Sequence, residues 1–253
     1  MNIIGHRKIF LTISGFLVTA AIAAIIIFGF QPGIDFKGGS LWQLKIMQTN
    51  AESLKNFFET DLKVAGITIF PAESGGFLVR LPHISEDEHQ NFLSALKNKF
   101  GEIDELRFEN IGPAVGRELE TKAFWAIGLV ILGISLYIAF AFRKVSYPVK
   151  SWKYGVITLL TLFHDIIIPA GLIAVLGWKF GVEIDTNFVV ALLVVMGFSV
   201  HDTIVVFDRI RENLLLQRGR FDLTTVINSS VNQTFARSVN TSLTLVLVLL
   251  ALL

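Results

Sequence analysis

The sequence predicts an α-helical polytopic membrane protein that carries one folded α+β domain outside the membrane. Hydrophobic residues make up 53% of its 253 residues, and most of them fall in long runs. A polar stretch separates the first of these runs from the others. A soluble domain of this size could not bury so much apolar sequence, so the runs are predicted to cross a membrane.

Five apolar runs have the length of a membrane-spanning helix, which needs about 20 residues. They are predicted at 9–30, 124–142, 156–176, 188–207 and from about 235 to 253. The first run is longer than the apolar core of a signal peptide, and the Gln31-Pro32-Gly33 that follows is not a small-residue cleavage site. We therefore expect this run to remain in the protein as the first span.

The polar stretch predicts a domain with the element order β-α-β-β-α-β. Strands are predicted at 40–48, 67–72, 77–81 and 103–111, with the hairpin signal Glu73-Ser-Gly-Gly76 between the second and the third. A first helix is predicted at 51–64, after the N-cap Asn50. A second helix follows Ser85, which forms a capping box with Glu88. This order is that of a ferredoxin-like sandwich.

Two apolar stripes give each predicted helix of this domain a face to bury. The stripes consist of Leu54, Phe57, Phe58 and Leu62 in the first helix, and of Phe92, Leu93, Leu96 and Phe100 in the second. The acidic residues of the domain outnumber the basic ones, which is the ordinary composition of a solvated surface and identifies no ligand.

Basic residues predict the orientation in the membrane. They precede the first span and follow the second and the fourth, where the loops contain Arg143, Lys144, Lys150, Lys153, Arg209, Arg211, Arg218 and Arg220. Lys and Arg concentrate in cytoplasmic loops, so the N-terminus is predicted to be cytoplasmic and the folded domain periplasmic. The chain is thus divided into 1–30 with the first span, 31–121 with the folded domain, and 122–253 with spans two to five.

Three of the apolar runs contain polar or charged side chains that predict a functional site. His201 and Asp202 lie within the fourth run, where an Asp at the centre of a helix costs about 2.5 to 3.5 kcal/mol. The third run contains His164 and Asp165. In the fifth, Arg237, Asn240, Thr241 and Thr244 share one helical face. These residues are predicted to form an intramembrane polar site, with Asp202, Arg237 and His201 as its proton-coupling part.

The chemistry that suits such a site is proton transfer. Protonation of Asp202 would make or break a pairing with Arg237 and shift the helices, which converts a proton gradient into motion. Two alternatives stay open. Arg237 lies near the start of its helix and can instead snorkel to the interface. The two histidines can serve only as hydrogen-bonding partners that hold neighbouring helices together.

Composition excludes several classes of function. The chain has no cysteine, which removes disulfides, thiolate metal sites and thiol nucleophiles, and its net charge of +1 argues against nucleic-acid binding. An intramembrane aspartyl protease would use two acids, but its Tyr-Asp and Gly-x-Gly-Asp motifs are missing around Asp165 and Asp202. A lipid or drug exporter remains the alternative. No enzyme activity, cofactor or metal is predicted.

Four segments resemble the SecF family, the smaller subunits of the SecDF protein-export factor in the resistance-nodulation-division superfamily. They are Gly33-Ile-Asp-Phe-Lys-Gly-Gly-Ser40, which contains Asp35, Gly38 and Gly39, and the segments 109–119, 197–213 and 230–244. The resemblance implies six spans in the bacterial cytoplasmic (inner) membrane, of which the sixth is missing here. It also implies that Asp202 and Arg237 match the family's proton-linked pair. His201 stands where that family usually has Asn.

The same resemblance implies a function and a set of partners. The protein would use the proton-motive force to assist protein translocation across the membrane. Its partners would be SecD, the SecYEG channel, YajC, the translocating unfolded polypeptide and the membrane lipid.

Overall fold

The computed structural model describes residues 1–47, 49–72, 76–141, 150–216 and 222–251, which form two compact units. One unit contains Met1–Gln31 and Trp125–Leu253, and the other contains Pro32–Phe124. Some predicted features lie outside the described residues. These are Gln48 at the end of the first strand, positions 73–75 of the hairpin, and Arg143, Lys144, Arg218 and Arg220 of the basic loops.

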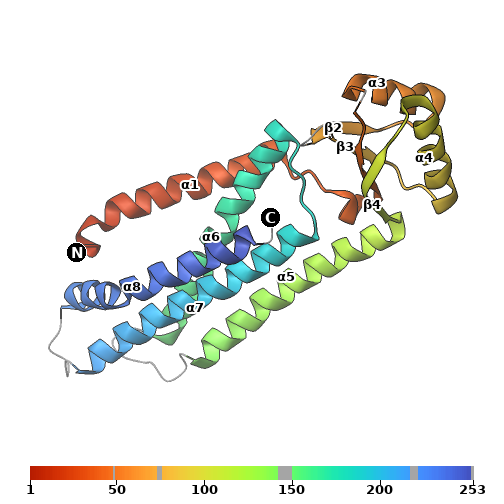
Figure 1. The fold of residues 1–253 in the computed structure, drawn as a ribbon. Helices are drawn as coiled ribbons and strands as arrows, with labels where there is room; N and C mark the ends of the chain where they lie inside the picture. Colours follow the sequence, from red (N-terminus) through yellow and green to blue (C-terminus); the bar gives the residue numbers. More distant parts are fainter. Residues whose placement is uncertain (48, 73–75, 142–149, 217–221, 252–253) are drawn as a thin grey trace. The chain divides into compact units, whose positions relative to one another are not determined.

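Long helices build the first unit (Figure 1). They are α1 (Arg7–Phe28), α6 (Ser151–Phe180), α7 (Thr186–Leu216), α8 (Leu223–Leu250) and the part of α5 (Pro113–Ala141) from Trp125 onward. A short 3-10 helix, Ile4–His6, precedes α1. Among the described residues, four segments are long and apolar enough to cross a membrane: Ile4–Phe28, Pro113–Ala141, Trp152–Phe180 and Thr186–Leu216. The polar stripe of α8 keeps that helix out of this group, so the fifth span stays a prediction.

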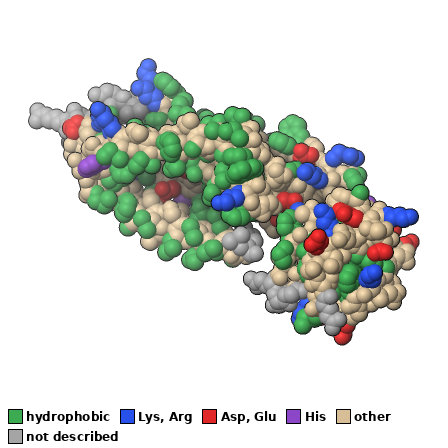
Figure 2. Space-filling view, turned by 90° about the horizontal axis from the view of Figure 1, so that it is seen from above, with side chains coloured by type: hydrophobic (Ala, Val, Ile, Leu, Met, Phe, Trp, Pro, Cys, Tyr) green, Lys and Arg blue, Asp and Glu red, His purple; other side chains and the backbone are tan. Residues whose placement is uncertain are grey.

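The helices of this unit pack as a series in which α1 contacts α6, α6 contacts α7, and α7 contacts α8. Hydrophobic side chains are spread along the whole helical surface seen in Figure 2, as is expected of helices that face lipid. A buried cluster joins α5, α6 and α7 through Ile138, Tyr154, Leu162, Met196 and Val200. This cluster fixes α7, the helix that carries Asp202, against two neighbours.

Small residues bring α1 and α6 into backbone contact. Ala21 and Ala24 of α1 are buried, and so are Ala170 and Ala174 of α6. A Cβ atom added to Gly171 would lie 2.5 Å from the Cα of Ala21. Within a bilayer, such close approach of backbones lets dispersion forces hold two helices together.

An antiparallel sheet forms the core of the second unit. Its strands are β1 (Gly39–Lys45), β2 (Thr68–Ala72), β3 (Gly76–Leu81) and β4 (Asp104–Ile111), in the order β2-β3-β1-β4. Alternate residues of β1 and β3 point to one face, where they pack against α3 (Ala51–Asn56) and α4 (Glu86–Phe100). Trp42, Leu44, Val79, Leu54 and Leu96 are fully buried there. The element order and the two predicted helical stripes are therefore present in the structure.

The first helix of this unit is shorter than predicted. The helix expected at 51–64 ends as α3 at Asn56, and a π-helical turn, Phe57–Asp61, continues the chain. Phe57 and Phe58 are adjacent in sequence yet both buried, at 7% and 0% exposure. A regular helix separates consecutive side chains by about 100°, whereas the wider turn lets both rings reach the core.

Both predicted helix caps are formed. The Asn50 side chain accepts a hydrogen bond from the Ser53 amide at 2.7 Å. Ser85 and Glu88 form the complete capping box at the start of α4. The Ser85 amide donates to Glu88 and lowers the pKa of that carboxyl. Because the folded-state pKa is the lower one, this contribution to stability is present above the unfolded-state pKa and is lost as the pH falls through the folded-state value.

One acidic residue of the second unit is not the solvated surface charge that composition suggests. The Glu105 carboxylate accepts from the Trp42 indole at 3.1 Å and lies 2.8 Å from Nε2 of His89. His89 is only 4% exposed and stacks on Phe108, with 3.8 Å between the ring centroids. The periodicity of the sequence could not predict this contact, because the contact joins a residue of one helix to residues of two strands.

Candidate functional site

Asp202 is held between α7 and α8. The Ser238 hydroxyl of α8 donates a hydrogen bond to Oδ1 of Asp202 at 2.8 Å. Asp202 itself is half-buried. The contact ties the two helices through a carboxyl group whose second oxygen, Oδ2, accepts no hydrogen bond from the described residues. That oxygen can take up a proton or a further donor.

A second carboxyl group is held one helix further along, between α6 and α7. The Ser199 hydroxyl of α7 donates to Oδ2 of Asp165 at 2.6 Å. Nδ1 of His164 lies 2.7 Å from the other oxygen, Oδ1. Both side chains are about one-third exposed. Among the described residues, His, Asp and Glu side chains nowhere gather in the groups of three that a metal ion would need.

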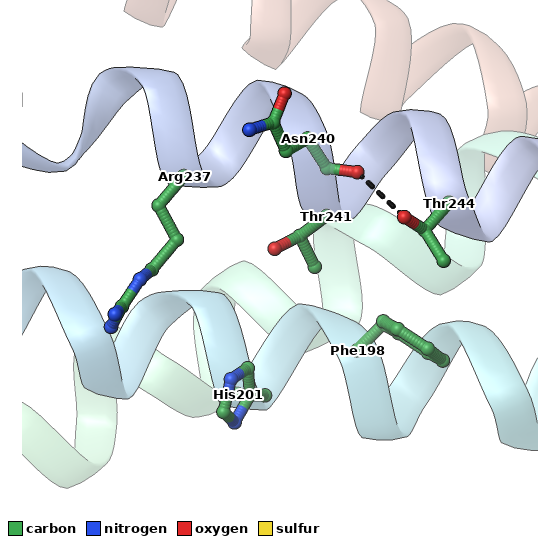
Figure 3. Close-up of a pocket in the computed structure, with 6 residues that line it drawn as sticks. All are labelled: Phe198, His201, Arg237, Asn240, Thr241 and Thr244. Carbon is green, nitrogen blue, oxygen red and sulfur yellow. Dashed lines mark hydrogen bonds between the residues drawn. The ribbon is translucent and has the colours of Figure 1, made fainter.

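A groove of about 450 Å³ lies between α7 and α8. It is lined by Phe198 and His201 from α7 and by Arg237, Asn240, Thr241 and Thr244 from α8 (Figure 3). His201, Arg237, Asn240 and Thr244 are exposed in this chain, whereas Thr241 is half-buried. The polar stripe of α8 thus borders an open groove.

Arg237 and Asp202 are not paired in this structure. Figure 3 shows the Arg237 side chain extending from α8 toward α7. None of the ion pairs formed by the described residues includes Arg237, and Asp202 bonds to Ser238 instead. The predicted Asp202–Arg237 pairing therefore stays a prediction. His164 and Asp165 belong to α6 and do not line this groove.

Sequence reasoning missed the two serines that hold the carboxyl groups. Ser199 precedes Asp202 by three positions on α7, and Ser238 directly follows Arg237 on α8. The i, i+3 spacing of Ser199 and Asp202 was a readable signal, since it places both on neighbouring positions of one helix surface. Which helix each would contact could not be read from the spacing.

The glycine-rich motif lies in the other unit and has a structural explanation. Gly33 is the N-cap of a short helix, α2 (Ile34–Lys37), which was not predicted and which contains Asp35 in its first turn. Gly38 and Gly39 follow with φ angles of +75° and +135°, a region that favours glycine. A Cβ atom on Gly38 would lie 2.8 Å from the Cα of Pro113, at the start of α5.

The segments 33–40 and 109–119 meet at this point. A Cβ atom on Gly116 would lie 2.9 Å from the Phe36 carbonyl oxygen. The buried Ser40 hydroxyl donates to Oδ1 of Asn110 at 2.8 Å. Two motifs that are far apart in the sequence thus form one tightly packed contact, which holds the start of α5 against α2 and Gly38.

Comparisons with known proteins give consistent results along the chain. Residues 91–253 match the family model "Protein export membrane protein SecD/SecF, C-terminal", and residues 23–45 match the "SecD/SecF GG Motif". A protein translocase subunit SecF from Thermobaculum terrenum is 42% identical over 264 residues, covering 100% of this chain and 82% of the relative. A SecDF subunit from Thermus thermophilus is 40% identical, covering 94% of this chain and 32% of the relative.

The fold is also similar to a solved structure. The crystal structure of SecDF, a translocon-associated membrane protein from Thermus thermophilus, superposes with a TM-score of 0.80 at 31% identity. The match covers 100% of this chain and 34% of the SecDF chain.

Proposed function

The chain belongs to the SecD/SecF family of protein-export membrane proteins, and on that premise we propose that it is a proton-motive-force-linked subunit of protein translocation. The observation that carries the proposal is the Asp202–Ser238 hydrogen bond inside the helical unit. An ionised Asp202 can only accept from Ser238, whereas a protonated one can also donate from Oδ2. The protonation state therefore changes what the carboxyl group can bind next to α8.

We propose Asp202, Arg237 and His201 as the proton-coupling residues, with Asn240 and Thr241 lining the groove that they share. Two states follow from this arrangement. In the state described here, Asp202 binds Ser238 and Arg237 lines the groove. In the other state, a deprotonated Asp202 takes Arg237 as its partner. Exchange between the two would move α8 relative to α7, because both partners of Asp202 are on α8.

The same proposal assigns partners and membrane topology. The Thermus thermophilus SecDF relative is about three times as long as the part that matches, which supports SecD as a partner for this chain. SecYEG, YajC and the unfolded polypeptide are proposed from the family's role in export. The α8 helix is the proposed fifth span, and the N-terminus is proposed to be cytoplasmic and the unit around the sheet periplasmic. The strand order β2-β3-β1-β4 supports a ferredoxin-like fold for residues 31–121.

Reconstitution tests the function directly. Vesicles containing this protein, SecD and SecYEG are loaded with a secretory chain, and export is measured with and without a proton gradient. We expect the gradient to increase export only when this protein is present. Drug efflux or peptide cleavage in place of gradient-dependent export would show that the proposal is wrong.

Arg237→Lys separates pairing from snorkelling. Lysine keeps the charge and a stem that reaches the headgroups, but it lacks the planar fork that binds a carboxylate through two donors. We expect gradient-dependent export to fall while the amount of protein in the membrane stays constant. The matched control is Arg209→Lys, which changes an exposed pair with Glu212. Full export by Arg237→Lys would identify Arg237 as an interface anchor.

A further inference from the structure

Of the two acids inside the predicted third and fourth spans, Asp165 is the more completely bonded. Both of its oxygens have a partner, Ser199 at 2.6 Å and His164 at 2.7 Å. Buried or partly buried acids in a membrane span are costly unless they are paired, so this degree of bonding requires an explanation. A purely structural tie between α6 and α7 would need only the Ser199 contact.

We infer that Asp165, His164 and Ser199 form a second proton-binding site, separate from Asp202. The inference rests on the proposed function and deepens it, since it adds a place where a translocated proton resides. The site binds a bare proton and takes no metal or organic ligand.

The same arrangement of heavy atoms is satisfied with and without the bound proton. When Asp165 is ionised, it accepts from the Ser199 hydroxyl and from Nδ1–H of neutral His164. When one proton is added, it can stay on Oδ1 and donate to Nδ1, with the imidazole hydrogen then on Nε2. One proton enters, and no side chain has to move.

The helices around Asp165 and His164 contribute mainly apolar side chains next to this site. The α5 helix contributes Val130, Ile134 and Ile138 to the packing of α6 and α7, all of them apolar. The charged residues of α1, Arg7 and Lys8, lie in its first turn, and positions 9–28 carry no charge. The other titratable groups of α7 near this level are His201 and Asp202, and Arg237 of α8 lines the groove beyond them.

The α7 helix links the two acids. Ser199 binds Asp165 on α6, and Asp202, three positions later, binds Ser238 on α8. A proton on Asp165 removes the charge of the group that Ser199 of α7 binds on α6, and a proton on Asp202 removes the charge that α7 presents to α8. The contacts of α7 with both protonatable groups therefore lie within one turn of this helix.

Infrared difference spectra between acidic and alkaline buffer test the inference. The full chain is reconstituted with SecD in vesicles, and the carbonyl stretch of protonated carboxyl groups is recorded. We expect Asp165→Asn to remove one component and Asp202→Asn to remove another. Asp165→Glu should shift the first component without removing it, which shows that its loss is not caused by misfolding.

Ser199→Ala adds a test of position. It removes the hydroxyl that donates to Asp165, so the first component should move to higher frequency and the Asp202 component should not. The matched control is Ser135→Ala on α5, whose hydroxyl donates to the Ile131 carbonyl of its own helix. Spectra of Asp165→Asn identical to wild type, or equal spectra for Ser199→Ala and Ser135→Ala, would overturn the site. If both components are present but export ignores the gradient, the site stands and the proposed function fails.

Discussion

Asp202→Asn is expected to reduce export to the level measured without a proton gradient. Asparagine has nearly the same shape and keeps an oxygen that can accept from the Ser238 hydroxyl, so the α7–α8 contact should survive. It cannot gain or lose a proton, so the two states of the site can no longer exchange. Export from reconstituted vesicles, with and without a gradient, measures the effect.

The matched control is Asp185→Asn on the same helix. Asp185 caps α7 by accepting from the Phe188 amide at 2.8 Å, and asparagine is an equally good N-cap. This variant should therefore export as well as the wild type does. A gradient-dependent increase that is undiminished in Asp202→Asn would contradict the assignment of Asp202.

Gly171→Ala is expected to destabilise the helical unit strongly. The added methyl group would lie 2.5 Å from the Cα of Ala21, and because that atom is backbone, α1 and α6 must move apart. Overpacking of this kind costs about 1 to 3 kcal/mol. The loss should appear as a lower midpoint of thermal unfolding in detergent, together with weaker association of α1 with the rest of the unit.

A glycine-to-alanine substitution at another position of this helix pair, Gly15, should not lower the midpoint of thermal unfolding. Nothing lies within 4 Å of a Cβ atom added to Gly15 of α1. Since alanine is favoured over glycine in a helix by about 1 kcal/mol, Gly15→Ala should leave the midpoint unchanged or raise it. Equal midpoints for the two variants would show that the α1–α6 contact is looser than the structure has it.

Local signals in the sequence predicted most elements of the fold. Asn50 and Ser85 marked helix starts that the structure confirms, because a cap depends only on residues three positions apart. The run containing Asp202 became a candidate span from its length and composition alone. The π-helical turn after Asn56 was missed, since it depends on where two neighbouring phenylalanines find room in the core.

The candidate site was also predicted only in part, because its contacts depend on how the helices pack. Composition and spacing identified Asp165, Asp202 and Arg237 as unusual within apolar runs. They could not show that Asp165 of α6 contacts α7 while Asp202 of α7 contacts α8, because helix rotation is set by packing partners. The structure gives Asp202 a serine partner that periodicity alone does not single out, and its pairing with Arg237 stays a prediction.

The contact between Gly38 and the start of α5 has a consequence for sequence variation among relatives. Neither Gly38 nor Gly116 has room for a methyl group, and the atoms in the way are backbone atoms of the other segment. A larger side chain at one position therefore cannot be offset by a smaller one at the other. We expect the two glycines to be replaced together, and only in relatives in which the whole junction differs. In all other relatives, both positions should be glycine.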